Sequence, residues 1–255
     1  MFQRTIKNEI TFFSYGVYFK ENVVVKCYPA QPNTGIIING EKLTVEKITV
    51  ENNTTVFKSQ KEKIFLIEHF LAVLFLLKID NLIIEIFGKE FPFFDGSGKE
   101  YYLALKDLLI DQIPHKKSFM EIKKKLLITD NKNFIFLSPK KDFSLLFITN
   151  FPNYLSWQIV KEDNNFLKVL FAQTPIPFKI LKKPDFDFLK NLGYFKKGDW
   201  LLGKGSFSEH KLLDFFGNLK ILNKEIKAKI IAFRPSHKLN IKLINKLIKE
   251  EKNGH

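Results

Sequence analysis

The sequence predicts an α+β protein made of two similar halves that face each other. Short strand patterns fill the first 60 residues, and longer apolar segments of helical spacing follow them. A succession of helix, strand and helix is expected twice, at 68–77, 82–87 and 98–110, and again at 209–219, 226–233 and 239–250. Because the two successions match in pattern, we expect two similar layers that each bring one histidine to their common boundary.

The composition excludes several classes of protein. Hydrophobic residues make up 45% of the 255 residues, so the chain can bury a substantial core. Cys27 is the only cysteine, which excludes a disulfide framework and a thiolate metal site. The net charge is +14, but only Arg4 and Arg234 are arginines among the 41 basic residues. Because base and phosphate recognition favours arginine, we expect a lysine-covered surface, weakly attracted at most to anionic headgroups, and no nucleic-acid partner.

No segment of the chain has the pattern of a secretion signal or a membrane span. The N-terminal residues lack the apolar core of a signal peptide, and the longest apolar run, at 70–77, is too short for a bilayer. The sequence therefore predicts a soluble, cytoplasmic protein.

The first half is expected to begin with strands at 6–13, 23–28, 35–38 and 43–50. An apolar helix is expected at 62–77, followed by a strand at 82–87. Ser97 and Glu100 have the spacing of a capping box, so a second helix is expected to start there. A break near 112–117 then predicts a domain boundary, which gives domains 1–116 and 117–255.

The second half is expected to hold strands, a short helix and then the second helix–strand–helix succession. The strands are expected near 121–129, 133–138, 143–149, 155–161 and 166–172, and the short helix near 185–192. A stretch rich in Gly and Lys follows at 193–205. Ser208 is the expected cap of the next helix.

Two polar pairs on predicted helices are candidates for a site. His210 and Asp214 are four residues apart, so they point from one helical face and could fill two positions of a Zn²⁺ shell. Such a pair is more often merely solvated, and it becomes a site only with a third ligand. Glu68 and His69 lie inside an otherwise apolar helix, where burial costs several kcal/mol without partners. This favours a site over a charged rim at that helix.

Two further residues are site candidates only in combination with the residues above. His237 falls at the turn between the last strand and the last helix, where a histidine alone would be a cap or a surface residue. Thr174 is expected at a strand end, where a hydroxyl usually serves the turn. Since His69, His210 and His237 all fall at matching edges of the two layers, we expect them to meet at one site between the layers.

The motifs occur in an order typical of one family. Glu68-His69 is followed by Asp95-Gly96-Ser97, by His210-Lys211-x-x-Asp214 with Gly217, and by His237. Gln3-Arg4-Thr5 and Asn33-Thr34-Gly35 precede them, so the likeness runs nearly from end to end. The chain resembles the UDP-3-O-acyl-N-acetylglucosamine deacetylases, the zinc amidases that commit a sugar nucleotide to lipid A synthesis.

The resemblance implies two similar two-layer sandwich domains, each a β-sheet packed on two helices, with the active site at their interface. It also implies that His69, His210 and Asp214 hold Zn²⁺ and leave one position open. The reaction would be hydrolysis of the N-acetyl group of UDP-3-O-(3-hydroxyacyl)-N-acetylglucosamine to acetate and a free amine. The implied catalytic residues are Glu68 as general base, His237 as general acid and Thr174 as a hydrogen-bond donor to the oxyanion.

Substrate contacts are implied at Lys211 and in an insert, shortened here to about 175–205. Apolar residues of this insert are expected to line a passage for the acyl chain, namely Phe186, Phe188 and Leu192, with Leu189 and Tyr194. The protein is expected to be a monomer with at most peripheral contact with the inner membrane.

The sequence departs from the family at Asn218, where the family has an Asp that supports the acid histidine. Because an opposite charge favours a protonated imidazole, this change predicts a narrower or more acidic pH optimum. Two alternative functions remain open at this point. One is a diverged relative with weak or altered N-acyl specificity, and the other is a basic binding module without catalysis.

Overall fold

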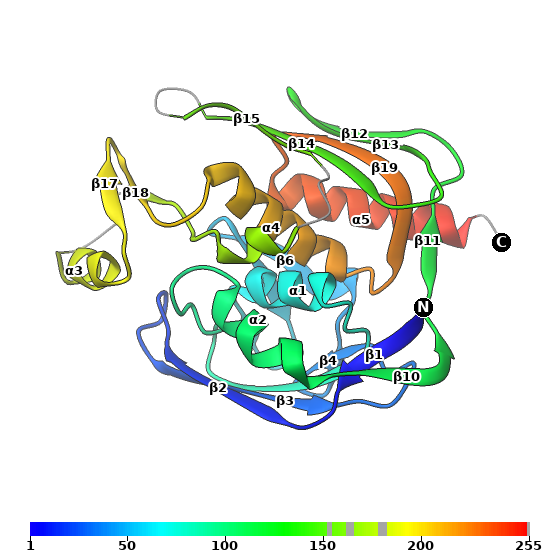
Figure 1. Cartoon of the computed structure of the whole chain (residues 1–255), viewed down its shortest axis with the longest axis horizontal. Coiled ribbons are helices and arrows are strands. Elements are labelled where there is room, and N and C mark those ends of the chain that lie inside the picture. The colour runs from blue at the N-terminus through cyan, green and yellow to red at the C-terminus, as the bar shows by residue number, and fades with distance from the viewer. Residues whose placement is uncertain (152–154, 162–165, 178–182, 254–255) are drawn as a thin grey trace.

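The protein has four layers, with a sheet on each outer side and helices between them (Figure 1). The computed structural model describes residues 1–151, 155–161, 166–177 and 183–253. Helices α1 (Ile67–Leu76) and α2 (Lys99–Leu105) lie on the first sheet, and α4 (Phe207–Lys220) and α5 (His237–Lys252) lie on the second. The predicted α+β class is confirmed. The domain division at residue 116 stays a prediction.

The N-terminal sheet has the strand order β2-β3-β9-β4-β5. Its central strands β3 and β9 alternate, so that Val25, Cys27 and Ile84 are buried in the core while their neighbours face outward. A small sheet of order β6-β7-β8 contacts helices α1 and α5, and β1 pairs with β10. The bounds are β1 Phe2–Ile6, β2 Ile10–Tyr15, β3 Asn22–Pro29, β4 Ile36–Ile38, β5 Glu41–Lys42, β6 Ile48–Glu51, β7 Thr54–Lys58, β8 Lys63–Ile64, β9 Leu82–Phe87 and β10 Leu109–Lys116.

The C-terminal sheet has the strand order β12-β13-β19-β14-β15, and β11 pairs with the beginning of β19. Strand β14 runs parallel to β19, whereas β12–β13, β13–β19 and β14–β15 are antiparallel. An insert of β16, α3, β17 and β18 projects from the body at the left of Figure 1. The bounds are β11 Phe119–Glu121, β12 Leu126–Asp130, β13 Asn133–Pro139, β14 Ser144–Phe151, β15 Leu155–Lys161, β16 Ile176–Pro177, α3 Lys183–Asn191, β17 Phe195–Lys197, β18 Trp200–Leu202 and β19 Glu225–Phe233.

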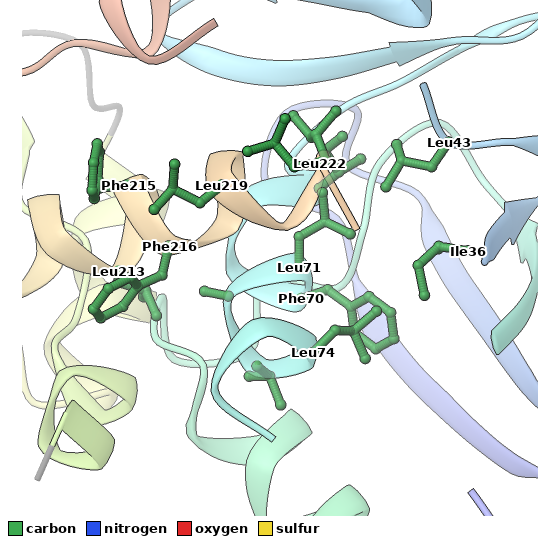
Figure 2. Packing of buried hydrophobic residues seen from close by; sticks show 14 of the residues in the cluster. Ile36, Leu43, Phe70, Leu71, Leu74, Leu213, Phe215, Phe216, Leu219 and Leu222 are labelled. Carbon is green, nitrogen blue, oxygen red and sulfur yellow. The ribbon is translucent and has the colours of Figure 1, made fainter. Parts of the chain in front are cut away.

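Helices α1 and α4 pack against each other and join the two halves into one core (Figure 2). The rings of Phe75 and Phe216 stack across this contact, with their centroids 5.0 Å apart. Each fully buried Leu or Phe contributes about 1.5–3 kcal/mol, so this shared core holds the two halves in one relative position. Among the described helices none is long and apolar enough to cross a bilayer.

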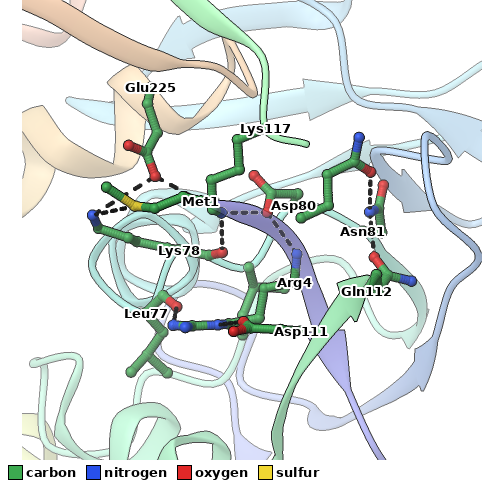
Figure 3. A network of polar contacts seen from close by, with 12 residues as sticks. Met1, Arg4, Leu77, Lys78, Asp80, Asn81, Asp111, Gln112, Lys117 and Glu225 are labelled. Atoms are coloured by element: carbon green, nitrogen blue, oxygen red, sulfur yellow. Dashed lines mark hydrogen bonds and ion pairs between the residues drawn. The ribbon is translucent and has the colours of Figure 1, made fainter. Parts of the chain in front are cut away.

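A polar network ties the halves together at the far end of α1 (Figure 3). The Asp80 carboxylate accepts hydrogen bonds from the backbone N–H of Arg4, at 2.8 Å, and from the Lys117 ammonium. Lys117 also donates to the carbonyl of Lys78 at 2.8 Å, and its Nζ lies 3.8 Å from a carboxylate oxygen of Glu225. The two ends of α1 are therefore both fixed, one by this network and the other by the site described below.

Several expected elements differ from the structure. The helix predicted at 62–77 begins only at Ile67, because Leu66 adopts a left-handed conformation with φ of 58° and β8 occupies Lys63–Ile64. The strand predicted at 166–172 is instead a 3-10 helix over Phe166–Phe171. The prediction was wrong because a short apolar run has no periodicity that separates a helix from a strand. The break expected near 112–117 belongs to β10 and pairs with β1.

The expected helix caps also shift. Ser97 precedes the Gly98 N-cap of α2, and no capping box forms with Glu100. Helix α4 is capped by Ser206, which forms a capping box with Glu209, so Ser208 lies inside the first turn. There its hydroxyl hydrogen-bonds Thr149.

Candidate metal centre

A cavity of about 1130 Å³ lies where the N-terminal ends of α1, α4 and α5 converge. Its lining includes residues from β7, from the insert, from the ends of β13 and β14 and from the turn that follows β19. Five of the predicted site residues, drawn from both halves of the chain, line its inner end: Glu68, His69, His210, Asp214 and His237. The cavity therefore lies at the boundary of the two layers, where the sequence predicted a site.

The three predicted metal ligands come together. The Nε2 atoms of His69 and His210 each lie 3.6 Å from Oδ1 of Asp214, and the two rings are perpendicular, with centroids 5.2 Å apart. Ligand atoms held by one tetrahedral zinc at about 2.0–2.1 Å lie roughly 3.3 Å from one another. The two nitrogens and the carboxylate oxygen therefore fit a zinc ion, and the donor set is one that zinc prefers.

Close contact between two helices makes this meeting possible. Gly217 of α4 faces the backbone of α1, and a Cβ on it would lie 2.0 Å from the carbonyl oxygen of Glu68. Only glycine permits this approach. It brings the first turn of α1, with Glu68 and His69, directly beside the turn of α4 that carries Asp214.

The protonation states suit metal binding. Burial lowers the pKa of His210 to about 3, so the ring is neutral at pH 7. Its Nδ1 lies 3.4 Å from the carbonyl oxygen of Ala172, which accepts the Nδ1 proton and leaves Nε2 free to act as a ligand. Burial alone would raise the pKa of Asp214, but the Lys211 ammonium, 2.8 Å from Oδ2, leads the contacts that hold this pKa well below its ordinary value.

Glu68 is a buried carboxylate held by two donors from β7. The Thr54 hydroxyl donates to Oε1 at 2.6 Å, and the backbone N–H of Thr55 donates to Oε2 at 3.2 Å. Both threonines are buried, so water does not compete for these contacts. These two contacts fix the orientation of the carboxylate, which lies beside the predicted metal ligands and close to Asp214 and His237.

His237 opens α5 and is also held on both ring nitrogens. Its Nε2 lies 3.5 Å from Oδ2 of Asp214, and its Nδ1 faces the Thr55 hydroxyl at 3.0 Å and Oδ1 of Asn218 at 3.2 Å. The Asn240 amide donates to the same Asn218 oxygen at 2.9 Å, which fixes that oxygen as an acceptor. We therefore assign the proton of the ring to Nδ1, with Nε2 directed into the cavity.

Only some of the remaining predicted residues line the cavity. Thr174 lines the cavity, but its hydroxyl and its N–H both donate to the carbonyl of Gly96 at 2.8 Å. Lys211 lines the cavity and pairs with Asp214.

In the insert, Phe188 and Leu189 line the cavity, whereas Leu192 packs with Leu189 and Tyr194 in a small separate cluster. Phe186 belongs to α3, but its side chain lies outside the described residues.

The sequence pattern assigns no role to three residues that support the site: Thr54, Thr55 and Asn240. Asn218 is recognisable only as a departure from the family pattern. Thr54 and Thr55 follow an Asn-Asn turn at the start of β7, where threonine is ordinary strand chemistry. Their burial beside Glu68 depends on α1 and could not be derived from local pattern.

Comparison with known proteins gives one consistent result. The chain matches the family described as LpxC: UDP-3-O-acyl N-acetylglycosamine deacetylase over residues 3–199 and 199–249. It is 27% identical to a UDP-3-O-acyl-N-acetylglucosamine deacetylase of Aquifex aeolicus, over 98% of this chain and 94% of that protein. It is also 27% identical to the protein of the same name from Helicobacter pylori strain J99, over 99% of this chain and 93% of that protein. This chain belongs to the UDP-3-O-acyl-N-acetylglucosamine deacetylase family.

Proposed function

We propose that this protein is a Zn²⁺-dependent deacetylase that hydrolyses the N-acetyl amide of UDP-3-O-(3-hydroxyacyl)-N-acetylglucosamine, the committed step of lipid A synthesis. The observation that carries the proposal is the convergence of two imidazoles and a carboxylate beside a second buried carboxylate and a third imidazole. The names of the related proteins support the substrate. We further propose that the protein acts as a cytoplasmic monomer.

His69, His210 and Asp214 would hold the metal, because their ligand atoms already lie at suitable separations without rearrangement. A zinc ion with an open position supplies Lewis acidity toward a carbonyl oxygen and lowers the pKa of a bound water to about 7. The neutral state of His210 means that no proton has to be displaced from that ring at pH 7.

Glu68 would act as the general base. Water attacks the acetyl carbon, and the proton that it loses passes to the Glu68 carboxylate, whose two oxygens are positioned by Thr54 and Thr55. Such proton transfer accelerates hydrolysis by roughly 10²–10⁴-fold. The fixed orientation of the carboxylate keeps it ready for the water without a reorganisation step.

His237 would act as the general acid. Its Nε2 faces the cavity, so in the imidazolium form, which carries a second proton on Nε2 besides the one on Nδ1, that second proton can stabilise the tetrahedral oxyanion and then pass to the amine nitrogen as the C–N bond breaks. The products are acetate and the free amine. Thr174 would assist the oxyanion if its hydroxyl turns away from Gly96 when the substrate binds.

The rest of the cavity would receive the substrate. Lys211 lines the cavity beside Asp214, and its ammonium would contact polar substrate groups. Phe188 and Leu189 supply apolar surface for the acyl chain, where each buried CH₂ is worth about 0.8 kcal/mol.

Metal content measured together with acetate release tests the proposal. The purified protein is expected to contain one zinc per chain and to release acetate from the UDP-sugar. His210→Ala is expected to lose both zinc and activity, while the control His115→Ala, in exposed β10, keeps both. If His210→Ala keeps stoichiometric zinc, the ligand assignment is wrong. If the zinc-loaded protein releases no acetate from this substrate, the proposed reaction is wrong.

A further inference from the structure

The outer face of the C-terminal sheet is apolar, and none of the described elements covers it. Side chains alternate along its strands, and the inward set is buried against the helices. In Figure 1 no described element lies over the opposite face, which forms the upper surface of the molecule. The outward set on this face, here called the sheet patch, has nine apolar side chains that are all at least partly exposed: Leu127, Phe134, Phe136, Leu146, Ile148, Trp157, Ile159, Ile231 and Phe233.

The strand register makes the sheet patch continuous. One row runs across four strands as Leu127, Phe136, Ile231 and Leu146, and the next as Phe134, Phe233, Ile148 and Ile159. The Phe233 ring stacks on Phe134 with centroids 5.4 Å apart and on Trp157 at 5.7 Å. Leu127 is 63% exposed and Trp157 is 59% exposed. A contiguous apolar surface of this kind marks an interaction site.

Two lysines flank the sheet patch. Lys229 lies in the row beside the patch, between Ser138 and Ser144, and Lys161 ends the row of Leu146. Both lysines are exposed. Among the described outward positions of β12–β15 and of β19 from Lys229 onward, none is acidic. This surface complements an anionic partner.

The sheet patch also borders the cavity. Asn133, Asn150 and Arg234 line the cavity. Asn133 and Arg234 adjoin Phe134 and Phe233 in the chain, and Asn150 pairs with Trp157. The stacked aromatic rings therefore lie next to the edge of the cavity.

We infer that the sheet patch docks on an anionic lipid membrane. Aromatic residues with apolar neighbours insert at the headgroup level, and the flanking lysines are attracted to anionic lipids. A second copy of the chain fits less well, because both copies carry a net charge of +14 and repel each other. If the proposed function holds, docking places the cavity beside the bilayer, from which an acylated substrate can enter. The docking itself does not depend on the reaction.

Lipid vesicles without substrate provide the test. Trp157 and Trp200 are the only tryptophans, so Trp200→Phe leaves Trp157 as the sole reporter. We expect its emission to shift to the blue and to be quenched when mixed vesicles contain brominated phosphatidylglycerol. Both the shift and the quenching are expected to be much smaller with vesicles made only of brominated phosphatidylcholine. Unchanged Trp157 fluorescence with anionic vesicles would overturn the proposal. So would equal binding to both vesicle types, or a lipid-free dimer in which Trp157 is already shielded.

Variants separate the sheet patch from general basicity. In co-sedimentation, Ile159→Ser is expected to weaken binding roughly tenfold and Lys229→Ser about fivefold. The matched control is Phe13→Ser, which removes an aromatic ring from the other outer sheet. The Phe13 side chain is 64% exposed, which is similar to the exposure of Ile159. Circular dichroism checks that each variant is folded. If Phe13→Ser weakens binding as much as Ile159→Ser, the sheet patch is not the docking surface.

Discussion

Gly217→Ala should disable the metal centre without touching a ligand. The added Cβ would lie 2.0 Å from the Glu68 carbonyl oxygen and 2.8 Å from its carbonyl carbon, both of which are backbone atoms of α1. No side chain can rotate to relieve this contact. Helix α1 or α4 must therefore move, and His69 must move relative to Asp214.

The size of the movement follows from the contact. Separating the new Cβ from the Glu68 oxygen to an acceptable distance opens the helix pair by roughly 1 Å at the site. Metal–ligand distances tolerate only about 0.2 Å, and a 1 Å misplacement of catalytic groups costs about 10²-fold in rate. Overpacking in a well-filled core also costs about 1–3 kcal/mol of the free energy of unfolding.

The assay is zinc content and kcat/KM of the folded variant, beside its free energy of unfolding. We expect zinc to be substoichiometric after dialysis and kcat/KM to fall at least about 100-fold. Leu243→Ala in α5 is the control. A buried Leu→Ala change lowers the free energy of unfolding by about 2–5 kcal/mol, and Leu243 lies away from the ligands. If Gly217→Ala retains full zinc and near-normal kcat/KM, the close helix contact does not set the site geometry.

Three further predictions concern groups around the site and the shared core. Asn218→Asp places a carboxylate against Nδ1 of His237, now 3.2 Å from the amide oxygen, and should move the alkaline limb of the pH–rate profile to higher pH; an unmoved profile contradicts this. Thr54→Val removes the 2.6 Å hydrogen bond to Glu68 and should lower kcat about tenfold with zinc retained, whereas loss of zinc would mean that Thr54 supports the ligands instead. Burial lowers the pKa of Lys220 from 10.5 to about 8, so the unfolded chain binds more protons between these values and stability should rise with pH there. Relative to Lys220→Met, the gain in the free energy of unfolding should reach about 3 kcal/mol, and parallel pH curves for the two proteins would refute it.

The sequence was most informative where chemistry and local pattern coincide. The four-residue spacing of His210 and Asp214 predicts one helical face, and the polar pair Glu68-His69 in an apolar helix predicts buried partners. The structure brings these residues together at one end of the α1–α4 pair. Their roles in binding metal and in catalysis stay predictions until the variants are measured.

The sequence was least informative where tertiary contacts override local preference. The apolar run at 166–171 has no period that separates a strand from a 3-10 helix, and its form is set by packing of Val169 and Leu170 into the core. The start of α1 depends on the left-handed Leu66, which no propensity would predict for a leucine. Likewise, the part played by Thr54 exists only because β7 and α1 meet.

The position of the site at three helix N-termini has an electrostatic consequence of its own. His69, His210 and His237 lie in the first turns of α1, α4 and α5. Each N-terminus carries a partial positive charge, worth about 0.3–1 kcal/mol to a nearby anion. The Glu68 and Asp214 carboxylates and a developing oxyanion all gain from this field. The three helix starts that gather these groups therefore also supply a field that favours the negative charges of the site.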